Sequence, residues 1–242
     1  MVGITWEILG FVWLGAFLGA FAIGTAGFAF ALATSALWLH ALDPMHTTLL
    51  IVACSTIVQL GMVWPMRRSI EIARVSPFVI AGLAGVPIGV YVLTRTDPHA
   101  IKVALGLFLA AYGVYALAAP RLPHIGGGRA ADAGIGFVSG ILGGIGGYSG
   151  VLPTIWTQLR GWPKDAARAV YQPFILVMQI ATFIVIGVVA LDPFGVALIV
   201  AAVPPLLAGA WLGWRAYGRL DERRFRQVIA ALLVASGVAL VF

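Results

Sequence analysis

Uncharged apolar runs recur from one end of this 242-residue chain to the other, and each is long enough to cross a lipid bilayer. A helical crossing needs about 20 apolar residues. The chain is 61% hydrophobic and 10% charged, whereas a soluble domain carries roughly 25% charged residues. The runs also lack the alternation of barrel strands, so helices must satisfy the backbone groups in lipid. The sequence therefore predicts an all-α polytopic membrane protein, with residues 1–242 forming a single domain.

Two of the apolar runs are too long for one crossing. We expect helical runs at about 6–39, 45–65, 74–94, 99–119, 131–160, 166–190, 193–216 and 224–242. A straight helix over the first would measure about 51 Å at 1.5 Å per residue, against a hydrocarbon core of about 30 Å. Glycines cluster inside the first and the fifth runs, and glycine destabilises a helix interior. We therefore expect a broken helix or a re-entrant hairpin in each.

The chain consists of two halves that resemble each other, joined by a linker at 120–130 with two prolines and three adjacent glycines. Gly85-Val-Pro-Ile-Gly89 in the first half recurs as Gly209-Ala-Trp-Leu-Gly213 in the second. We interpret this as an internal duplication, with repeat 1 over about 6–119 and repeat 2 over about 131–242, each a broken segment followed by about three transmembrane helices.

The basic residues indicate how the halves are oriented. If every run crossed the membrane once, the 15 lysines and arginines would divide about ten to five between the two sides. If the two long runs each enter and leave on one side, the division becomes about 13 to 2, as the positive-inside rule favours. That topology makes the repeats inverted and places both termini in the periplasm.

Inverted repeats with glycine-broken helices indicate a secondary transporter whose site lies at the repeat interface. A helix start carries unpaired N–H groups and a partial positive charge, so two such starts can bind an anion without a formal charge. The expected substrate-binding residues at the breaks are Gly24, Thr25, Gly27, Gly146, Gly147, Tyr148 and Ser149. The alternative for any of these glycines is close helix packing, which we favour for Gly85, Gly89 and their counterparts.

Polar residues in later runs form a second group of candidates. Gln59, Gln172 and Gln179 would either line the pathway or hydrogen-bond neighbouring helices. His46 and Arg168 stand at near-equivalent helix starts and are gate candidates. For Arg168, a charge that only sets orientation is the alternative.

Other function classes find less support in the sequence. The four histidines lack metal-ligand spacing, so we expect no metal and no cofactor. The chain has a net charge of +6, and its basic residues lie in short loops beside the apolar runs. Basic residues placed there set the orientation of a membrane protein and do not indicate nucleic acid binding. A membrane-embedded enzyme, such as a lipid-modifying transferase, is the alternative function. It would place an acid, base or metal cluster near one interface. We expect a lipid bilayer and a small anion as partners, and a homodimer as the assembly.

The glycine-rich segments resemble a known family. Gly143-Gly-Ile-Gly-Gly-Tyr-Ser-Gly-Val-Leu-Pro153, and more loosely Gly24-Thr-Ala-Gly-Phe-Ala-Phe-Ala31, are similar to the duplicated motif of the sulfite exporter TauE/SafE family, also called toluene sulfonate uptake permeases. The first copy lacks the proline that matches Pro153. The resemblance covers nearly the whole chain and implies transport of sulfite, a sulfonate or a related organosulfur anion across the bacterial inner membrane. We predict that this transport proceeds by alternating access.

Overall fold

The computed structural model describes residues 4–118, 125–216, 230, 234 and 238. Its helices are α1 (Trp6–Ala26), α2 (Phe30–Ala41), α3 (Pro44–Met66), α4 (Ile72–Arg95), α5 (Pro98–Ala118), α6 (Arg129–Gly146), α7 (Val151–Leu159), α8 (Lys164–Ala190) and α9 (Pro193–Ala216), with a 3-10 turn, η1 (Arg67–Ser69), after α3. Within these ranges α1, α3, α4, α5, α8 and α9 are long and apolar enough to cross a membrane. The predicted all-α polytopic fold is confirmed, whereas the run predicted at 224–242 lies largely outside the described residues.

Both long runs are interrupted where the sequence predicts. α1 ends at Ala26, and Gly27 follows with a φ of 86°. α6 ends at Gly146, and Gly147 follows with a φ of 77°. A left-handed residue after a helix is usually glycine, because a Cβ atom is strained there. The predicted breaks are therefore confirmed, and each one reverses the chain after a single helix.

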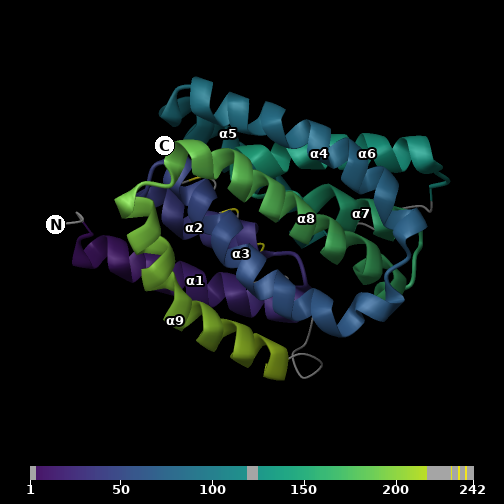
Figure 1. The fold of residues 1–242 in the computed structure, drawn as a ribbon, viewed down its shortest axis with the longest axis horizontal. Helices are drawn as coiled ribbons and strands as arrows, with labels where there is room; N and C mark the ends of the chain where they lie inside the picture. The colour runs from purple at the N-terminus through teal and green to yellow at the C-terminus, as the bar shows by residue number, and fades with distance from the viewer. Residues whose placement is uncertain (1–3, 119–124, 217–229, 231–233, 235–237, 239–242) are drawn as a thin grey trace.

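Glycines hold the broken helices against their neighbours. A methyl group on Gly89 of α4 would overlap the carbonyl oxygen of Ile141 in α6. In the matching contact between α9 and α1, a methyl group on Gly213 would lie 2.7 Å from the carbonyl oxygen of Phe21. Figure 1 shows the resulting pairs, with α4 beside α6 and α1 beside α9. Such contacts need residues without side chains, so the packing interpretation of these glycines is confirmed.

α3 and α8 pack against each other between these two pairs and run antiparallel. The start of α3 meets the end of α8, since His46 Nε2 lies 3.4 Å from Oδ1 of Asp192. We call this end of the bundle the His46 end. We call the opposite end, where α3 finishes and α8 begins, the Arg168 end.

Each interrupted segment forms a hairpin whose arms lie side by side. In α1–α2, Trp38 Nε1 donates to the carbonyl of Phe11 at 3.0 Å, and α2 then leads into α3 at the His46 end. In α6–α7, Asp132 accepts hydrogen bonds from Trp156 at 2.8 Å and Arg160 at 3.0 Å, and α7 then leads into α8 at the Arg168 end. The two hairpins therefore point in opposite directions along the bundle.

Candidate functional site

One face of α8 carries polar side chains along the length of the bundle. Arg168, Gln172, Ile175, Gln179 and Thr182 follow one another at intervals of three or four residues, which places them on one side of a helix. Gln172, Gln179 and Thr182 are each at most 2% exposed. Polar groups buried within transmembrane helices mark substrate or ion pathways. This face of α8 is therefore the framework of the candidate site.

The first break lies against this face near the Arg168 end. A Cβ atom on Gly27 would lie 2.8 Å from Nε2 of Gln172, 3.4 Å from the hydroxyl of Tyr171 and 3.5 Å from Nη2 of Arg168. The absence of a side chain at Gly27 thus lets three hydrogen-bond donors of α8 approach the backbone just before α2. The N-cap of α2, Ala29, supplies no side-chain hydrogen bond, so the first N–H groups of α2 have no capping side chain. Donors from two elements therefore converge at this break.

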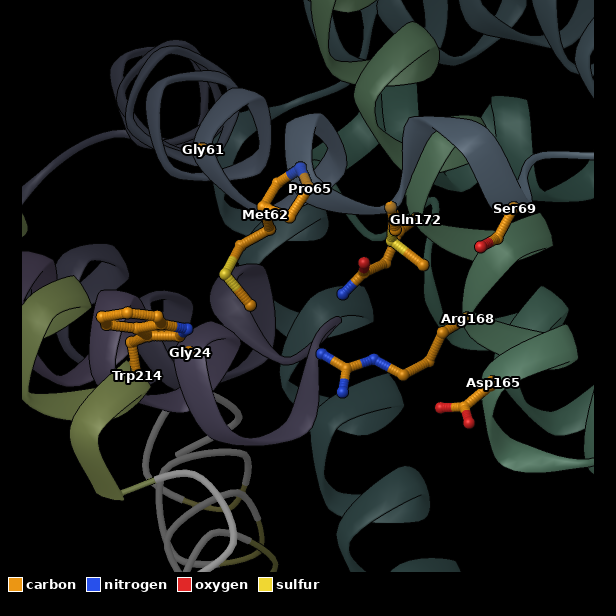
Figure 2. Close-up of a pocket in the computed structure, with 10 residues that line it drawn as sticks. Gly24, Gly61, Met62, Pro65, Ser69, Asp165, Arg168, Gln172 and Trp214 are labelled. Atoms are coloured by element: carbon orange, nitrogen blue, oxygen red, sulfur yellow. The ribbon is translucent and has the colours of Figure 1, made fainter.

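A cavity of about 530 Å³ adjoins the first break. Figure 2 shows the guanidinium of Arg168 and the amide of Gln172 directed into it from α8, with Met62 and Trp214 on the opposite wall. Gly24 also lines the cavity. Three residues predicted from the sequence, on two helices, therefore meet at one cavity.

The second break lies farther along the same face of α8, toward the His46 end. Nε2 of Gln179 donates to the carbonyl of Gly147 at 3.1 Å. Its Oε1 and the hydroxyl of Ser149 are buried, and neither has a hydrogen-bond partner among the described residues. An unpaired buried polar group costs about 1–3 kcal/mol, and in native structures such groups are usually satisfied by a ligand or ordered water. The second break thus also offers polar groups to a bound species.

Ile175 separates the two polar stretches. A Cβ atom on Gly150, in the second break, would lie 2.6 Å from Cδ1 of Ile175 and 3.4 Å from Cβ of Phe28, in the first break. Phe28 also packs edge-on against Tyr171, with ring centroids 6.3 Å apart. The breaks therefore approach each other midway along α8, where apolar side chains close the path between the polar groups.

α3 contributes polar groups from the helix packed against α8. Gln59 is fully buried, and in the described part of the chain neither atom of its amide has a hydrogen-bond partner. The hydroxyls of Ser55, one turn away on α3, and of Thr182 on α8 are also buried without a hydrogen-bond partner among the described residues. Ser55 and Thr182 were not among the leading candidates. Their position one turn from a candidate glutamine is the signal that identifies them.

Two predicted ligand donors are engaged within the protein instead. The hydroxyl of Thr25 donates to carbonyls of the preceding turn of α1 at 3.0 and 3.1 Å, as threonine in a helix commonly does. The hydroxyl of Tyr148 donates to Ser35 Oγ at 2.6 Å, and its ring packs against Phe108. Gly146 lies against the same ring, with its ideal Cβ position 2.8 Å from Cδ2 of Tyr148. In this structure these two hydroxyl protons are therefore bonded within the protein, and the predicted binding roles of Thr25 and Tyr148 stay predictions.

The gate candidates lie at opposite ends of the bundle. Arg168 lines the cavity at one end. His46 stands at the other, with Nδ1 2.6 Å from Oδ2 of Asp43. Partial burial raises the pKa of the Asp43 carboxyl, but hydrogen bonds from the side chain and backbone of His46 outweigh burial and lower it. Arg168 thus faces the cavity at the first break, whereas His46 at the other end is hydrogen-bonded to Asp43.

Comparison with known proteins places these features in a family. The family model described as sulfite exporter TauE/SafE matches residues 12–240. Comparisons with the curated proteins and with the solved structures found no match. The matching family is one of membrane transporters rather than enzymes, so the enzyme alternative is set aside.

Proposed function

This chain belongs to the sulfite exporter TauE/SafE family, and from that premise we propose that it is a secondary transporter that moves a small anion across the bacterial inner membrane by alternating access. The substrate is sulfite, a sulfonate or a related organosulfur anion. The observation that carries the proposal is the convergence of Arg168, Gln172 and the start of α2 at one cavity. All three present N–H groups, which can donate hydrogen bonds to an anion but not to a cation.

The donors at the cavity are suited to a sulfur oxyanion. Nε2 of Gln172 is buried and has no acceptor among the described residues, so an oxygen of the substrate would supply one. The guanidinium of Arg168 adds a charge, and hydrogen bonds to charged groups contribute about 1.5–3 kcal/mol. Asp165, which also lines the cavity, is exposed and therefore screened by solvent. A single oxyanion group would thus have partners on α8 and at the start of α2.

The fold supports two inverted repeats, about 6–119 and 131–242. The hairpins point in opposite directions, and the glycine contact of α4 with α6 has its counterpart in α9 with α1. Basic residues gather at helix ends on the Arg168 side, where the described ones are Arg67, Arg68, Arg74, Arg129, Arg160, Lys164, Arg168 and Arg215. Arg95 and Lys102 stand at the other end. By the positive-inside rule the Arg168 end is cytoplasmic and the termini are periplasmic.

With this orientation, we interpret the structure as an inward-facing state. The cavity lies at the cytoplasmic end, and Ile175 between Phe28 and Gly150 blocks the way onward. Rearrangement of the hairpins would move the block and expose Gln179 and its neighbours to the periplasm. The membrane potential drives an anion outward by about 2.3 kcal/mol per charge per 100 mV, so export requires no coupling ion.

Flux into proteoliposomes tests the proposal. The purified protein is reconstituted, and uptake of radiolabelled sulfite and of several labelled sulfonates is measured under imposed potentials of either sign. We expect saturable flux of at least one of these anions. The net direction of that flux should reverse when the sign of the imposed potential is reversed. Gln172→Leu should reduce that flux strongly, because it removes the buried amide donor while keeping a similar volume. Folded wild-type protein that carries none of these anions in either direction would refute the proposal.

A further inference from the structure

A single imidazole bridges the two halves of the protein at the His46 end. The His46 side chain is 19% exposed, and its Nδ1 lies 2.6 Å from Oδ2 of Asp43, in the turn before α3. Its Nε2 lies 3.4 Å from Oδ1 of Asp192, in the turn between α8 and α9. Phe194 packs edge-on against the ring, with centroids 5.2 Å apart. His46 thus stands between a carboxylate of the first half and a carboxylate of the second.

Each ring nitrogen of His46 faces a carboxylate. A neutral imidazole carries one N–H group, and at 2.6 Å from Asp43 the Nδ1 atom holds it. Nε2 is buried without a hydrogen-bond partner in the described ranges, yet it faces the carboxylate of Asp192. A lone pair at that position meets a negative charge, whereas a second proton would convert the same contact into an ion pair. The bridge is therefore complete only in the charged form of His46.

Both carboxylates remain ionised near neutral pH. Partial burial raises the pKa of Asp43, but the hydrogen bonds from His46 outweigh it and leave the pKa below its usual value. The backbone N–H of Gly195 lowers the pKa of Asp192. Histidine is the side chain that ordinarily changes charge between pH 5 and 8, so the state of this cluster follows His46.

Other titratable groups stand near this end of the bundle, on helices that pack against α3 or on the turn between two of them. They are Glu7, His40, Arg95, Asp97, His99 and Lys102. In the part of the chain that the structure describes, the ion-pair partners of His46 are Asp43 and Asp192. The groups on other helices therefore act on His46 only through solvent at longer range.

We propose that His46 is a proton-binding site that latches the His46 end of the bundle. With two protons on its ring, His46 ties Asp43 to Asp192 and holds the halves together. When the ring loses a proton, the tie to Asp192 is lost and this end opens. The latch is thus closed at low pH and released as the pH rises. This inference rests on the proposed alternating-access transport, in which the His46 end must open to release the anion.

Spin labels on the two halves measure the distance between the halves at the His46 end directly, and no substrate is needed. In a Cys54→Ser background, which removes the single cysteine, His40→Cys and Val188→Cys supply two label sites that are exposed in the structure. Double electron–electron resonance in nanodiscs then gives the distance distribution at pH 5.5 and pH 8.5. We expect a short distance to dominate at pH 5.5. The ratio of the longer to the shorter distance should rise by about two- to fivefold at pH 8.5, as expected for loss of a partly exposed ion pair.

Two substitutions at position 46 should give opposite results. His46→Gln cannot carry the second proton and should show the longer distance at both pH values. His46→Arg, which copies Arg168 at the near-equivalent position of the other half, should keep the shorter distance at both. His99→Gln, at the same end but outside the cluster, serves as the control and should retain the wild-type response.

Two results would overturn the latch. One is a wild-type distance distribution that does not change with pH, and the other is a pH response that persists in His46→Gln. The measurement is independent of flux. A pH-dependent distance in a protein that carries no anion would therefore refute the transport proposal and leave the latch standing.

Discussion

Replacing Gly89 by alanine tests the contact between α4 and α6 quantitatively. The new methyl group would overlap the carbonyl of Ile141 and lie 2.9 Å from Cα of Gly144. Both neighbours are backbone atoms that no rotamer change can move, so the helices must separate. Overpacking of this kind costs about 1–3 kcal/mol, and we expect the upper part of that range. The higher helix propensity of alanine returns about 1 kcal/mol, so the net destabilisation should be about 1–2 kcal/mol.

Unfolding in mixed micelles by titration with SDS measures this difference. Gly187→Ala is the matched control, because no described atom lies within 4 Å of its new methyl group. It should be stabilising by up to about 1 kcal/mol, which separates the two variants by about 2–3 kcal/mol. Gly213→Ala should behave like Gly89→Ala, since its methyl group would lie 2.7 Å from the carbonyl of Phe21 in the equivalent contact. Equal stability of Gly89→Ala and Gly187→Ala would show that α4 and α6 are not in backbone contact.

Four further substitutions distinguish the roles of polar side chains at the breaks. Arg168→Gln should weaken anion entry from the cavity end by about tenfold or more in KM, because it removes a charged hydrogen bond; unchanged flux kinetics would show that Arg168 only orients the protein. Gln179→Leu should lower flux, whereas Thr25→Val should leave it near wild type, since the Thr25 hydroxyl donates within its own helix. Tyr148→Phe should cost about 1 kcal/mol of stability in SDS titrations, through loss of the hydrogen bond to Ser35, with little change in the relative flux of different anions.

The helix breaks could be predicted from the sequence because length alone required them. A run that exceeds the membrane thickness must bend or turn back, and the glycines showed where. Gly27 and Gly147 do adopt left-handed conformations there. The helices that begin near position 72 and at position 193 also begin within a few residues of their predicted starts. Hydropathy and chain-reversing residues are local properties, which a sequence displays directly.

The composition of the site could be predicted only in part, because it depends on how helices are rotated against one another. Arg168 and Gln172 were predicted for different roles, as a gate and as a pathway residue, yet both contact the same glycine. That proximity is set by how the first break packs against α8, which composition does not report. Thr25 and Ser149 are both hydroxyl residues at a break. The geometry separates them, since Thr25 lies inside a helical turn with carbonyls to accept its proton and Ser149 lies in the loop without them.

The proposed export of an anion would account for the difference between the two ends of the bundle. In that proposal the anion leaves water when it enters at the Arg168 end, and a permanent cation such as Arg168 lowers the energy of entry there. A permanent cation at the His46 end, where the proposal places release, would retain the anion and slow its exit. In the proposed latch, a histidine avoids this conflict, because it would be charged while it bridges Asp43 and Asp192 and neutral once the bridge is broken. Substituting arginine for His46 should therefore slow export even though it makes the two ends more alike.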